Sequence, residues 1–292
     1  MTDFDDYMSR LGTDPEPPSV EAMFALHRAH VERIPYETTW IFLGERWDID
    51  VSSSVGRIAG QGRGGYCFHV NGAMAALLDH LGYDVTLHVG GVHGSDGPDA
   101  ASMTNHLVVN VAGLPTADNP DGHWYLDAGL GDALHEPLPL LAGVYRQGPL
   151  AFGLESTPGD VGDWHFTHDP RGSFSGMSFR SLPATIDGFT ERHLFLSTDP
   201  GSSFAGTPTV QRRDAGGVDI LRGLTLSRLE SNQATPRRVV TNRAEWFDVL
   251  AGVFGLTLGG VDEAGRDKLW ASAITAHQAW EQSQDSEQAE RP

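Results

Sequence analysis

The stretch GQGRGGYCF, residues 60–68, decides how the chain folds around its one cysteine. Its glycines allow the backbone to turn sharply, and apolar residues follow at helical spacing as far as residue 81. A helix that begins at Cys67 points its unpaired N–H groups and the positive end of its dipole at the thiol. Such a position stabilises a thiolate, the nucleophile of acyl transfer. The alternative is that Cys67 is a small buried apolar side chain.

A nucleophilic thiol needs a base, and the base needs a group that orients it. Among thirteen histidines, only His106 opens an expected strand whose neighbour ends in a carboxylate, Asp127. We expect these strands to pair with His106 opposite Asp127, a register that also sets Val109 opposite Trp124. One register then satisfies both the apolar pattern and the His–Asp pair. An ordinary structural hydrogen bond between the two side chains is the alternative.

The rest of the chain divides by its hydrophobic period. Up to about residue 82 the pattern is helical, with Ser19 as an expected N-cap and Pro35 as an expected stop. From Tyr83 the period becomes two, as in half-buried strands. A polar tail from residue 281 is expected to fray. The expected strands are residues 83–89, 107–111, 124–126, 193–198, 207–212, 218–222 and 224–229, and helices are expected after Asn242 and Asp262.

Composition restricts the function classes. The chain has 292 residues with 39% apolar side chains, enough for a globular body with a substantial core. Its net charge of −19 repels phosphate backbones and anionic lipids, so we expect neither a nucleic-acid nor a membrane partner. One cysteine forms no intramolecular disulfide, the first residues are acidic, and no apolar run reaches ~20 residues. We therefore expect a cytoplasmic protein.

Competing motifs are weaker. Residues 60–65 match the spacing of a dinucleotide-binding loop, but no convincing strand precedes them and no βαβ alternation follows. Residues 172–176 lack the spacing of a serine hydrolase elbow, and the chain has no phosphate-binding loop. His165 and His168 have no obvious third ligand, so we expect no metal site.

The motif RGGYCF at residues 63–68 resembles the nucleophile motif of the arylamine N-acetyltransferase family. NHL at 105–107 is similar to the family's histidine motif, and LDAGLG at 126–131 to its aspartate motif. The resemblance covers roughly residues 5–256 and implies an α+β fold with the three-part architecture of cysteine proteases and transglutaminases. The expected parts are a helical bundle with Cys67 at residues 1–85, a β-barrel with His106 and Asp127 at 86–200, an α/β lid at 201–280, and the polar tail at 281–292.

The resemblance implies a ping-pong acyltransferase with the triad Cys67, His106 and Asp127. The thiolate takes an acetyl or other short acyl group from acyl-CoA, and an amine, hydrazine or hydroxylamine then takes it from the cysteine. Acetyl-CoA or another acyl-CoA is then a cosubstrate, and no tightly bound cofactor is expected. Glu37, Arg63 and Asn71 are expected to support the nucleophile, and Tyr36, Asn105, Gly129, Leu130, Gly131 and Phe204 to contact the acceptor or CoA.

Four positions depart from the family's usual pattern. His69 stands where an acidic residue is usual, Leu130 replaces a phenylalanine, Asn105 a threonine and Tyr36 a phenylalanine. The loss of an aromatic face at Leu130 weakens stacking on a flat arylamine by about 0.5–1.5 kcal/mol, so a different acceptor or a bulkier acyl donor is expected.

Three other functions remain open from the sequence. The first is an amide synthase of natural-product biosynthesis, whose acyl chain sits on a carrier protein or comes from an unusual donor. The second is a thiol hydrolase or transglutaminase-like protein with the same triad. The third is a binding module without catalysis. The sequence leaves the acceptor, the acyl chain and the oligomeric state undetermined.

Overall fold

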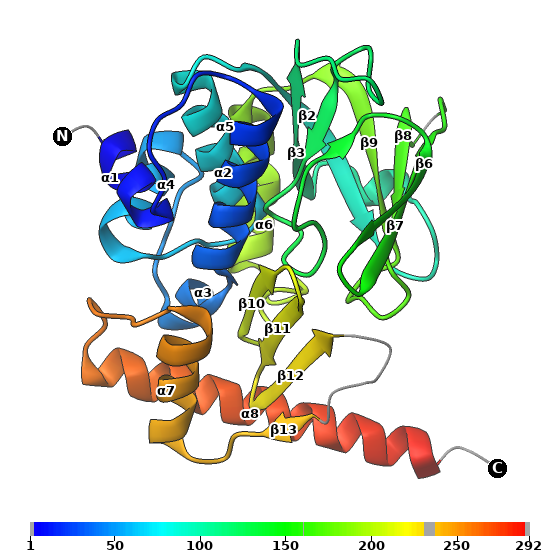
Figure 1. Ribbon diagram of the computed structural model, residues 1–292. Coiled ribbons are helices and arrows are strands. Elements are labelled where there is room, and N and C mark those ends of the chain that lie inside the picture. The colour runs from blue at the N-terminus through cyan, green and yellow to red at the C-terminus, as the bar shows by residue number, and fades with distance from the viewer. Residues whose placement is uncertain (1–2, 160, 231–236, 290–292) are drawn as a thin grey trace.

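The computed structural model describes residues 3–159, 161–230 and 237–289 of the chain. A helical part, a curled β-sheet and a smaller sheet with two helices follow one another along the sequence (Figure 1). This arrangement confirms the expected α+β class and the three-part architecture. Among the helices that the structure describes, none is both long and apolar enough to span a membrane.

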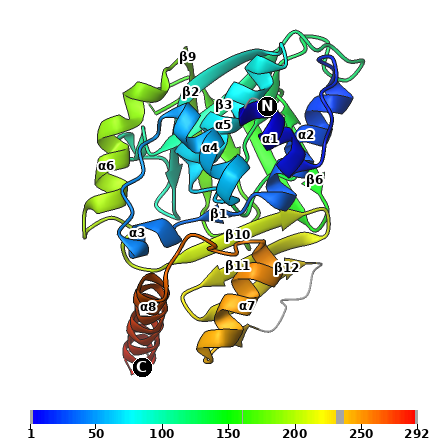
Figure 2. The same cartoon turned by 90° about the vertical axis from the view of Figure 1, so that its left-hand side faces the viewer.

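The helical part surrounds the helix that begins at Cys67 (Figure 2). Ser19 caps the second helix, because its hydroxyl accepts a hydrogen bond from the N–H of Ala22 at 3.1 Å. Residues 55–59, which a dinucleotide-binding loop would need as a strand, are helical, so that interpretation fails. The elements are α1 (Asp3–Leu11), α2 (Val20–Arg33), β1 (Tyr36–Glu37), α3 (Thr39–Leu43), α4 (Val51–Gln61) and α5 (Cys67–His80).

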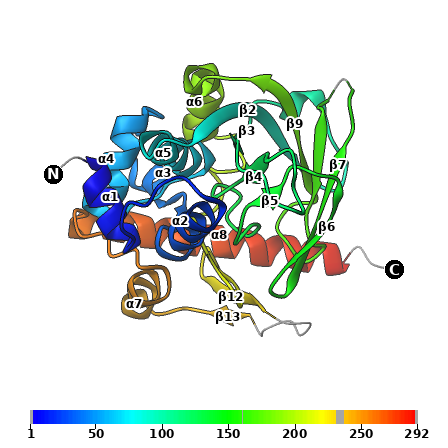
Figure 3. The same cartoon turned by 45° about the horizontal axis from the view of Figure 1, so that its top comes forward.

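The β part is one antiparallel sheet of eight strands, in the order β5-β4-β3-β2-β9-β8-β7-β6. The sheet curls into an almost closed barrel (Figure 3) around a core that contains Phe152, Phe166 and Phe179. Its strands are β2 (Asp84–His93), β3 (His106–Ala112), β4 (Trp124–Leu126), β5 (Leu138–Pro139), β6 (Gly143–Gln147), β7 (Leu150–Ser156), β8 (Trp164–Thr167) and β9 (Gly176–Pro183), and η1 (Ala100–Ser102) is a 3₁₀ turn.

The pairing of β3 with β4 differs from the predicted register by two residues. Val109 lies opposite Leu126, where we expected it opposite Trp124. A shift of two residues keeps every side chain on its expected face, so the apolar pattern does not distinguish the two registers. The β4 ladder ends at Leu126, and His106 therefore reaches Asp127 beyond the strand end rather than across the ladder.

Residues 193–198 form a helix, and the strand predicted there is wrong. Helix α6 (Thr190–Thr198) follows the 3₁₀ turn η2 (Ile186–Phe189) and buries His193 and Leu196, which are three residues apart. A short apolar run does not distinguish a strand from a helix by its period alone. As a helix, the segment places Leu196 at the wall of a cleft that Cys67 and His106 also line.

The C-terminal part is a sheet of five strands in the order β1-β10-β11-β12-β13, with two helices (Figure 1). Its first strand comes from the helical part, because Tyr36 pairs with Gln211. Asn242 caps α7 as expected. The chain is helical to Ala289. The prediction that the tail frays from residue 281 is therefore wrong for residues 281–289. The elements are β10 (Thr209–Asp214), β11 (Gly217–Arg222), β12 (Thr225–Glu230), β13 (Arg238–Val239), α7 (Arg243–Phe254) and α8 (Glu263–Ala289).

The division of the chain at residues 85 and 200 stays a prediction. Strand β2 begins at Asp84, close to the first boundary, and the second falls between α6 and β10. However, α6 lies within the residues assigned to the β-barrel and packs its Leu196 in the same cluster as Cys67 and Phe68 of α5.

Two histidines of α2 make the fold sensitive to acid. His27 and His30 are fully buried, and this burial lowers the pKa of His27 to about 4 and that of His30 to about 3. In the unfolded chain a histidine titrates near pH 6.5. Between these pH values the unfolded state binds more protons than the folded state. The stabilisation is therefore complete above about pH 6.5 and is lost as the pH falls through the folded pKa values.

We expect the free energy of unfolding to fall by about 1.4 kcal/mol per pH unit for each of these histidines below about pH 6.5. The variant His30→Gln cannot gain the proton, so its slope should be smaller by about one such contribution. Urea unfolding between about pH 7 and 5 measures the slopes, with the exposed His123→Gln as the control. Equal slopes for His30→Gln and the unmodified chain would contradict this origin of the acid sensitivity.

Candidate active site

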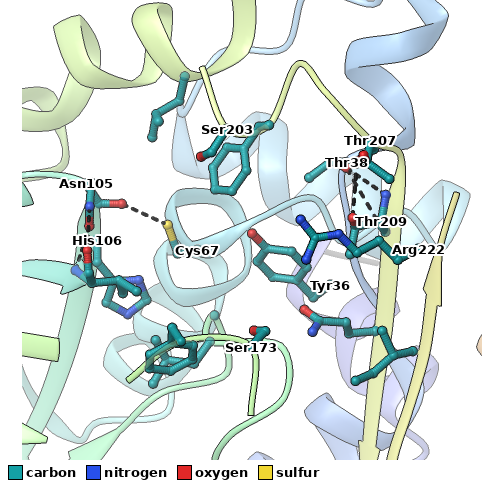
Figure 4. A pocket seen from close by; sticks show the side chains of 18 residues that line it. Tyr36, Thr38, Cys67, Asn105, His106, Ser173, Ser203, Thr207, Thr209 and Arg222 are labelled. Atoms are coloured by element: carbon teal, nitrogen blue, oxygen red, sulfur yellow. Dashed lines mark hydrogen bonds between the residues drawn. The ribbon is translucent and has the colours of Figure 1, made fainter. Parts of the chain in front are cut away.

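Cys67 lies at the base of a cleft where the three parts of the fold meet. The cleft has a volume of about 310 Å³ and takes wall residues from each part. Sγ of Cys67 lies 3.7 Å from the carbonyl oxygen of Asn105 (Figure 4). The residue is only 3% exposed. The sulfur is therefore reached from the cleft while the surrounding protein shields it from bulk water.

Two glycines of the motif bring the backbone to Cys67. A Cβ atom on Gly64 would lie 2.0 Å from the carbonyl oxygen of Pro35, so only glycine fits there. Gly65 has a φ of +81°, a conformation that side chains disfavour. Its carbonyl oxygen accepts a hydrogen bond from the N–H of Glu37 at 2.9 Å. The glycine pattern thus serves a close approach and a turn at the start of α5.

The structure brings the three predicted triad residues together. Nε2 of His106 lies 2.7 Å from Oδ2 of Asp127, and both side chains are buried. Burial alone would lower the pKa of His106, but Asp127 and the hydrogen-bonded sulfur of Cys67 outweigh it and raise the pKa to about 10. Because Nε2 is engaged by the carboxylate, Nδ1 is the ring nitrogen left for the sulfur.

The carboxylate of Asp127 receives hydrogen bonds on both oxygens. Besides His106, the hydroxyl of Tyr125 donates to Oδ2 at 2.8 Å. Nδ2 of Asn71 donates to Oδ1 at 2.8 Å, and the N–H of Gly129 donates to it at 3.0 Å. These donors give both oxygens of the buried carboxylate hydrogen-bond partners. The ring of His106 therefore has a fixed anionic partner.

Asn71 uses its whole amide in the site. Nδ2 also donates to the carbonyl oxygen of Leu107 at 2.7 Å, and Oδ1 accepts from the N–H of Ala128 at 2.9 Å. Asn71 lies on α5, one helical turn after Cys67. The side chain therefore fixes α5, which begins at Cys67, to β3 and to the loop that carries Asp127.

Arg63 and Glu37 form a buried ion pair below the motif. Nε of Arg63 lies 2.9 Å from Oε1 of Glu37, whose other oxygen accepts from the N–H of Thr39 at 2.8 Å. Burial alone would lower the pKa of Arg63, but the charge of Glu37 outweighs it and holds the pKa above its ordinary value. The pair ties the motif to the segment after α2 and has no contact with Cys67 among those that the structure describes.

The residues expected to contact substrate lie at or near the cleft. Gly131 instead borders a smaller neighbouring space, where a Cβ would lie 2.1 Å from Oε1 of Gln211. Oδ1 of Asn105 accepts a hydrogen bond from the N–H of Val92 at 2.8 Å, and Nδ2 donates to the carbonyl oxygen of Val92 at 3.0 Å. Asn105 therefore also stabilises this part of the cleft wall. The five predicted residues that line the cleft are Tyr36, Asn105, Gly129, Leu130 and Phe204.

Sequence reasoning missed Tyr125 and most of the lid side of the cleft. Tyr125 was detectable, because it lies two residues before Asp127 and so shares its face of the strand. The other missed residues come from several segments of the chain, and no local pattern identifies them as cleft residues. They are Thr38, Val92, Ser173, Phe174, Leu196, Ser203, Thr207, Thr209, Gln211, Ile220 and Arg222.

His69 caps the N-terminus of α5. Its Nδ1 accepts a hydrogen bond from the N–H of Tyr66 at 3.3 Å, and Nε2 lies 3.1 Å from the carbonyl oxygen of Asp48. Burial, with a smaller effect of Arg57, lowers the pKa of His69 well below its ordinary value. A neutral imidazole therefore fills this position at neutral pH. Elsewhere in the described part of the chain, no group of three or more His, Cys, Asp or Glu side chains is placed to hold a metal.

Comparison with known proteins gives one consistent family. The profile of a family described as "N-acetyltransferase" matches residues 19–263. An arylamine N-acetyltransferase of Mycolicibacterium smegmatis is 29% identical over 272 residues, which cover 91% of this chain and 95% of that protein. The solved M. smegmatis arylamine N-acetyltransferase matches with a TM-score of 0.81 at 27% identity, over 93% of this chain and 98% of that one. The Mycobacterium marinum arylamine N-acetyltransferase in complex with CoA shares the fold, with a TM-score of 0.80 at 24% identity, over 92% and 98%.

Gly129 is packed closely against Cys67, and a substitution at Gly129 tests this packing. A Cβ there would lie 2.7 Å from Cα and 2.9 Å from Cβ of Cys67. We expect Gly129→Ala to lower the free energy of unfolding by about 1–3 kcal/mol through overpacking, and to slow alkylation of Cys67 by iodoacetamide. Gly56→Ala is the matched control, because no atom lies within 4 Å of its Cβ position in α4. Equal behaviour of the two variants would refute this packing constraint.

Proposed function

Because this chain belongs to the arylamine N-acetyltransferase family, we propose that it transfers an acetyl or other short acyl group from acyl-CoA to an amine through acyl-Cys67. The proposal rests on one observation: the one cysteine of the chain lines the same cleft as His106, whose ring is hydrogen-bonded to the buried Asp127. The acceptors we propose are arylamines, hydrazines and hydroxylamines.

In the first half-reaction, the thiolate of Cys67 attacks the carbonyl carbon of the thioester. The new C–S bond forms, the bond to the sulfur of CoA breaks, and the protonated His106 gives its proton to the departing thiolate. The raised pKa of about 10 means that the imidazole carries this proton at neutral pH. Asp127 stabilises the charged ring and holds its orientation.

In the second half-reaction, an amine nitrogen attacks the acyl-cysteine. His106 has lost its proton to CoA and now accepts one from the attacking nitrogen, and the bond from the acyl carbon to Sγ breaks. The product is an amide, and the thiolate and imidazolium are restored. One imidazole thus serves first as acid and then as base, which is the advantage of dividing the transfer into two steps.

The cleft supports a flat acceptor despite Leu130. The family's aromatic face is missing at that position, but Phe174 lines the same cleft from the loop between β8 and β9. Its ring packs edge-on against His168, with centroids 4.3 Å apart. Phe204 lines the cleft from the segment after α6. With Tyr36, three aromatic side chains therefore line the cleft and are available for stacking.

The acyl-enzyme can be trapped without an acceptor. We expect incubation with acetyl-CoA alone to add one acetyl group to the protein, and mass spectrometry of peptides should place it on Cys67. Cys67→Ser is the control and should stay unmodified on the same time scale. The absence of an adduct with acetyl-, propionyl- and malonyl-CoA would refute acyl-CoA as the donor, and an adduct only with an acyl carrier protein would favour an amide synthase.

Removal of the charge on Asp127 tests the triad. We expect Asp127→Asn to slow acetylation of Cys67 by about 10²–10⁴-fold, because the ring loses its orienting anion. Rapid-quench measurement of acetyl-Cys67 gives the rate, and circular dichroism shows whether the fold persists. Tyr125→Phe, which removes one hydrogen bond but keeps the carboxylate, should have a much smaller effect. A folded Asp127→Asn protein with a near-normal rate would overturn the assignment.

A further inference from the structure

The hydroxyl of Tyr36 is a polar group at the cleft that the fold itself does not use. It makes no hydrogen bond with any residue that the structure describes. A partner within hydrogen-bond distance is present for the hydroxyl of every other tyrosine of the chain, namely Tyr7, Tyr66, Tyr83, Tyr125 and Tyr145. Because folded proteins pair most of their shielded polar groups, an unpaired hydroxyl at a cleft calls for a partner from outside the chain.

The fold holds the ring of Tyr36 in place. Its backbone pairs with Gln211 of β10 in the lid sheet. The ring lies against the loop that follows Asp127, where a Cβ on Gly131 would be 3.3 Å from Cγ of Tyr36. The hydroxyl is therefore presented to the cleft from a fixed position, without a rearrangement of the chain.

Tyr36 lies on the side of Cys67 that His106 leaves free. All three residues line one cleft, and Figure 4 shows the imidazole of His106 on one side of the sulfur and the hydroxyl of Tyr36 on the other. The imidazole exchanges a proton with the group that leaves or attacks the acyl carbon, so that group lies on the imidazole's side. The carbonyl oxygen of an acyl group on the sulfur then lies on the side of Tyr36.

The hydroxyl keeps its proton at neutral pH. Burial, with a smaller effect of the charge on Cys67, raises the pKa of Tyr36 well above its ordinary value. A protonated hydroxyl donates more strongly to an oxygen that gains negative charge than to a neutral carbonyl. Phenylalanine, which the family's usual pattern has at this position, has no such donor.

On the basis of the proposed function, we propose that Tyr36 is a catalytic residue that donates its O–H to the carbonyl oxygen of the acyl group during transfer. When the thiolate of Cys67 attacks the thioester, an electron pair of the C=O bond moves onto this oxygen. The pair returns as the bond to the sulfur of CoA breaks, and the hydroxyl keeps its proton throughout. The amine's attack on the acyl-cysteine charges the same oxygen, so the same donor serves both half-reactions.

The test compares two reactions of one sulfur. Acetylation by acetyl-CoA charges a carbonyl oxygen, whereas alkylation by iodoacetamide displaces iodide from a saturated carbon. We expect Tyr36→Phe to lower the ratio of the acetylation rate to the alkylation rate at Cys67 by about 10- to 100-fold. Tyr145→Phe removes a hydroxyl of β6 that bonds the carbonyl oxygen of Leu141, and it should leave the ratio unchanged. Equal ratios for the two variants would overturn the proposal.

A loss of folding is distinguished by the same comparison. The hydroxyl of Tyr36 has no described protein partner to lose, so Tyr36→Phe should keep the thermal midpoint of the unmodified chain. A rearranged site would slow acetylation and alkylation alike and leave their ratio unchanged. That outcome would also overturn the role of Tyr36 as a donor.

The ester p-nitrophenyl acetate separates this proposal from the choice of acyl donor. Its acetyl group passes to the thiolate as p-nitrophenolate departs, without CoA. We expect Tyr36→Phe to lower this rate, relative to alkylation, by about tenfold or more. That result without acetylation by any acyl-CoA would keep Tyr36 as a donor and refute the proposed function. Acetylation by acetyl-CoA with no effect of Tyr36→Phe would do the reverse, and no acetylation of Cys67 by either reagent would refute both.

Discussion

The carboxylate of Asp127 is a charge taken out of water, and four donors from separate segments replace that water. The donors are Asn71 of α5, His106 of β3, Tyr125 of β4 and the N–H of Gly129 in the following loop. An unpaired buried charge costs several kcal/mol, so the folded state must keep these segments together. The same contacts that make the charge tolerable orient the imidazole. Stability and the geometry of the site therefore depend on one group.

The lid is fixed to the barrel in a different way, through backbone carbonyls. Arg213 of β10 is 1% exposed and donates to the carbonyl oxygens of Ala133, Gln147 and Gly217. Burial lowers its pKa to about 10, so it remains charged at neutral pH. Carbonyl oxygens are present whatever the side chains are, so this attachment tolerates sequence change around the cleft. The β1–β10 pairing attaches the lid to the helical part as well.

The features that the sequence predicted well are local ones. Ser19 and Asn242 act within a few residues, so the helix starts that they cap follow from short-range chemistry. Features set by tertiary packing were missed. The register of β3 with β4 was wrong by two residues, since the apolar pattern has a period of two. The lid residues of the cleft come from strands more than a hundred residues after Cys67, and no spacing links them to it.

The three residues assigned to bond exchange lie within residues 67–127, while Arg222 and the lid strands supply the opposite wall of the cleft. The three residues proposed for bond exchange and the opposite wall of the cleft are therefore encoded in separate stretches of the chain. A substitution in the lid strands can therefore alter that wall, and with it the range of molecules that fit, without replacing any of the three residues assigned to bond exchange.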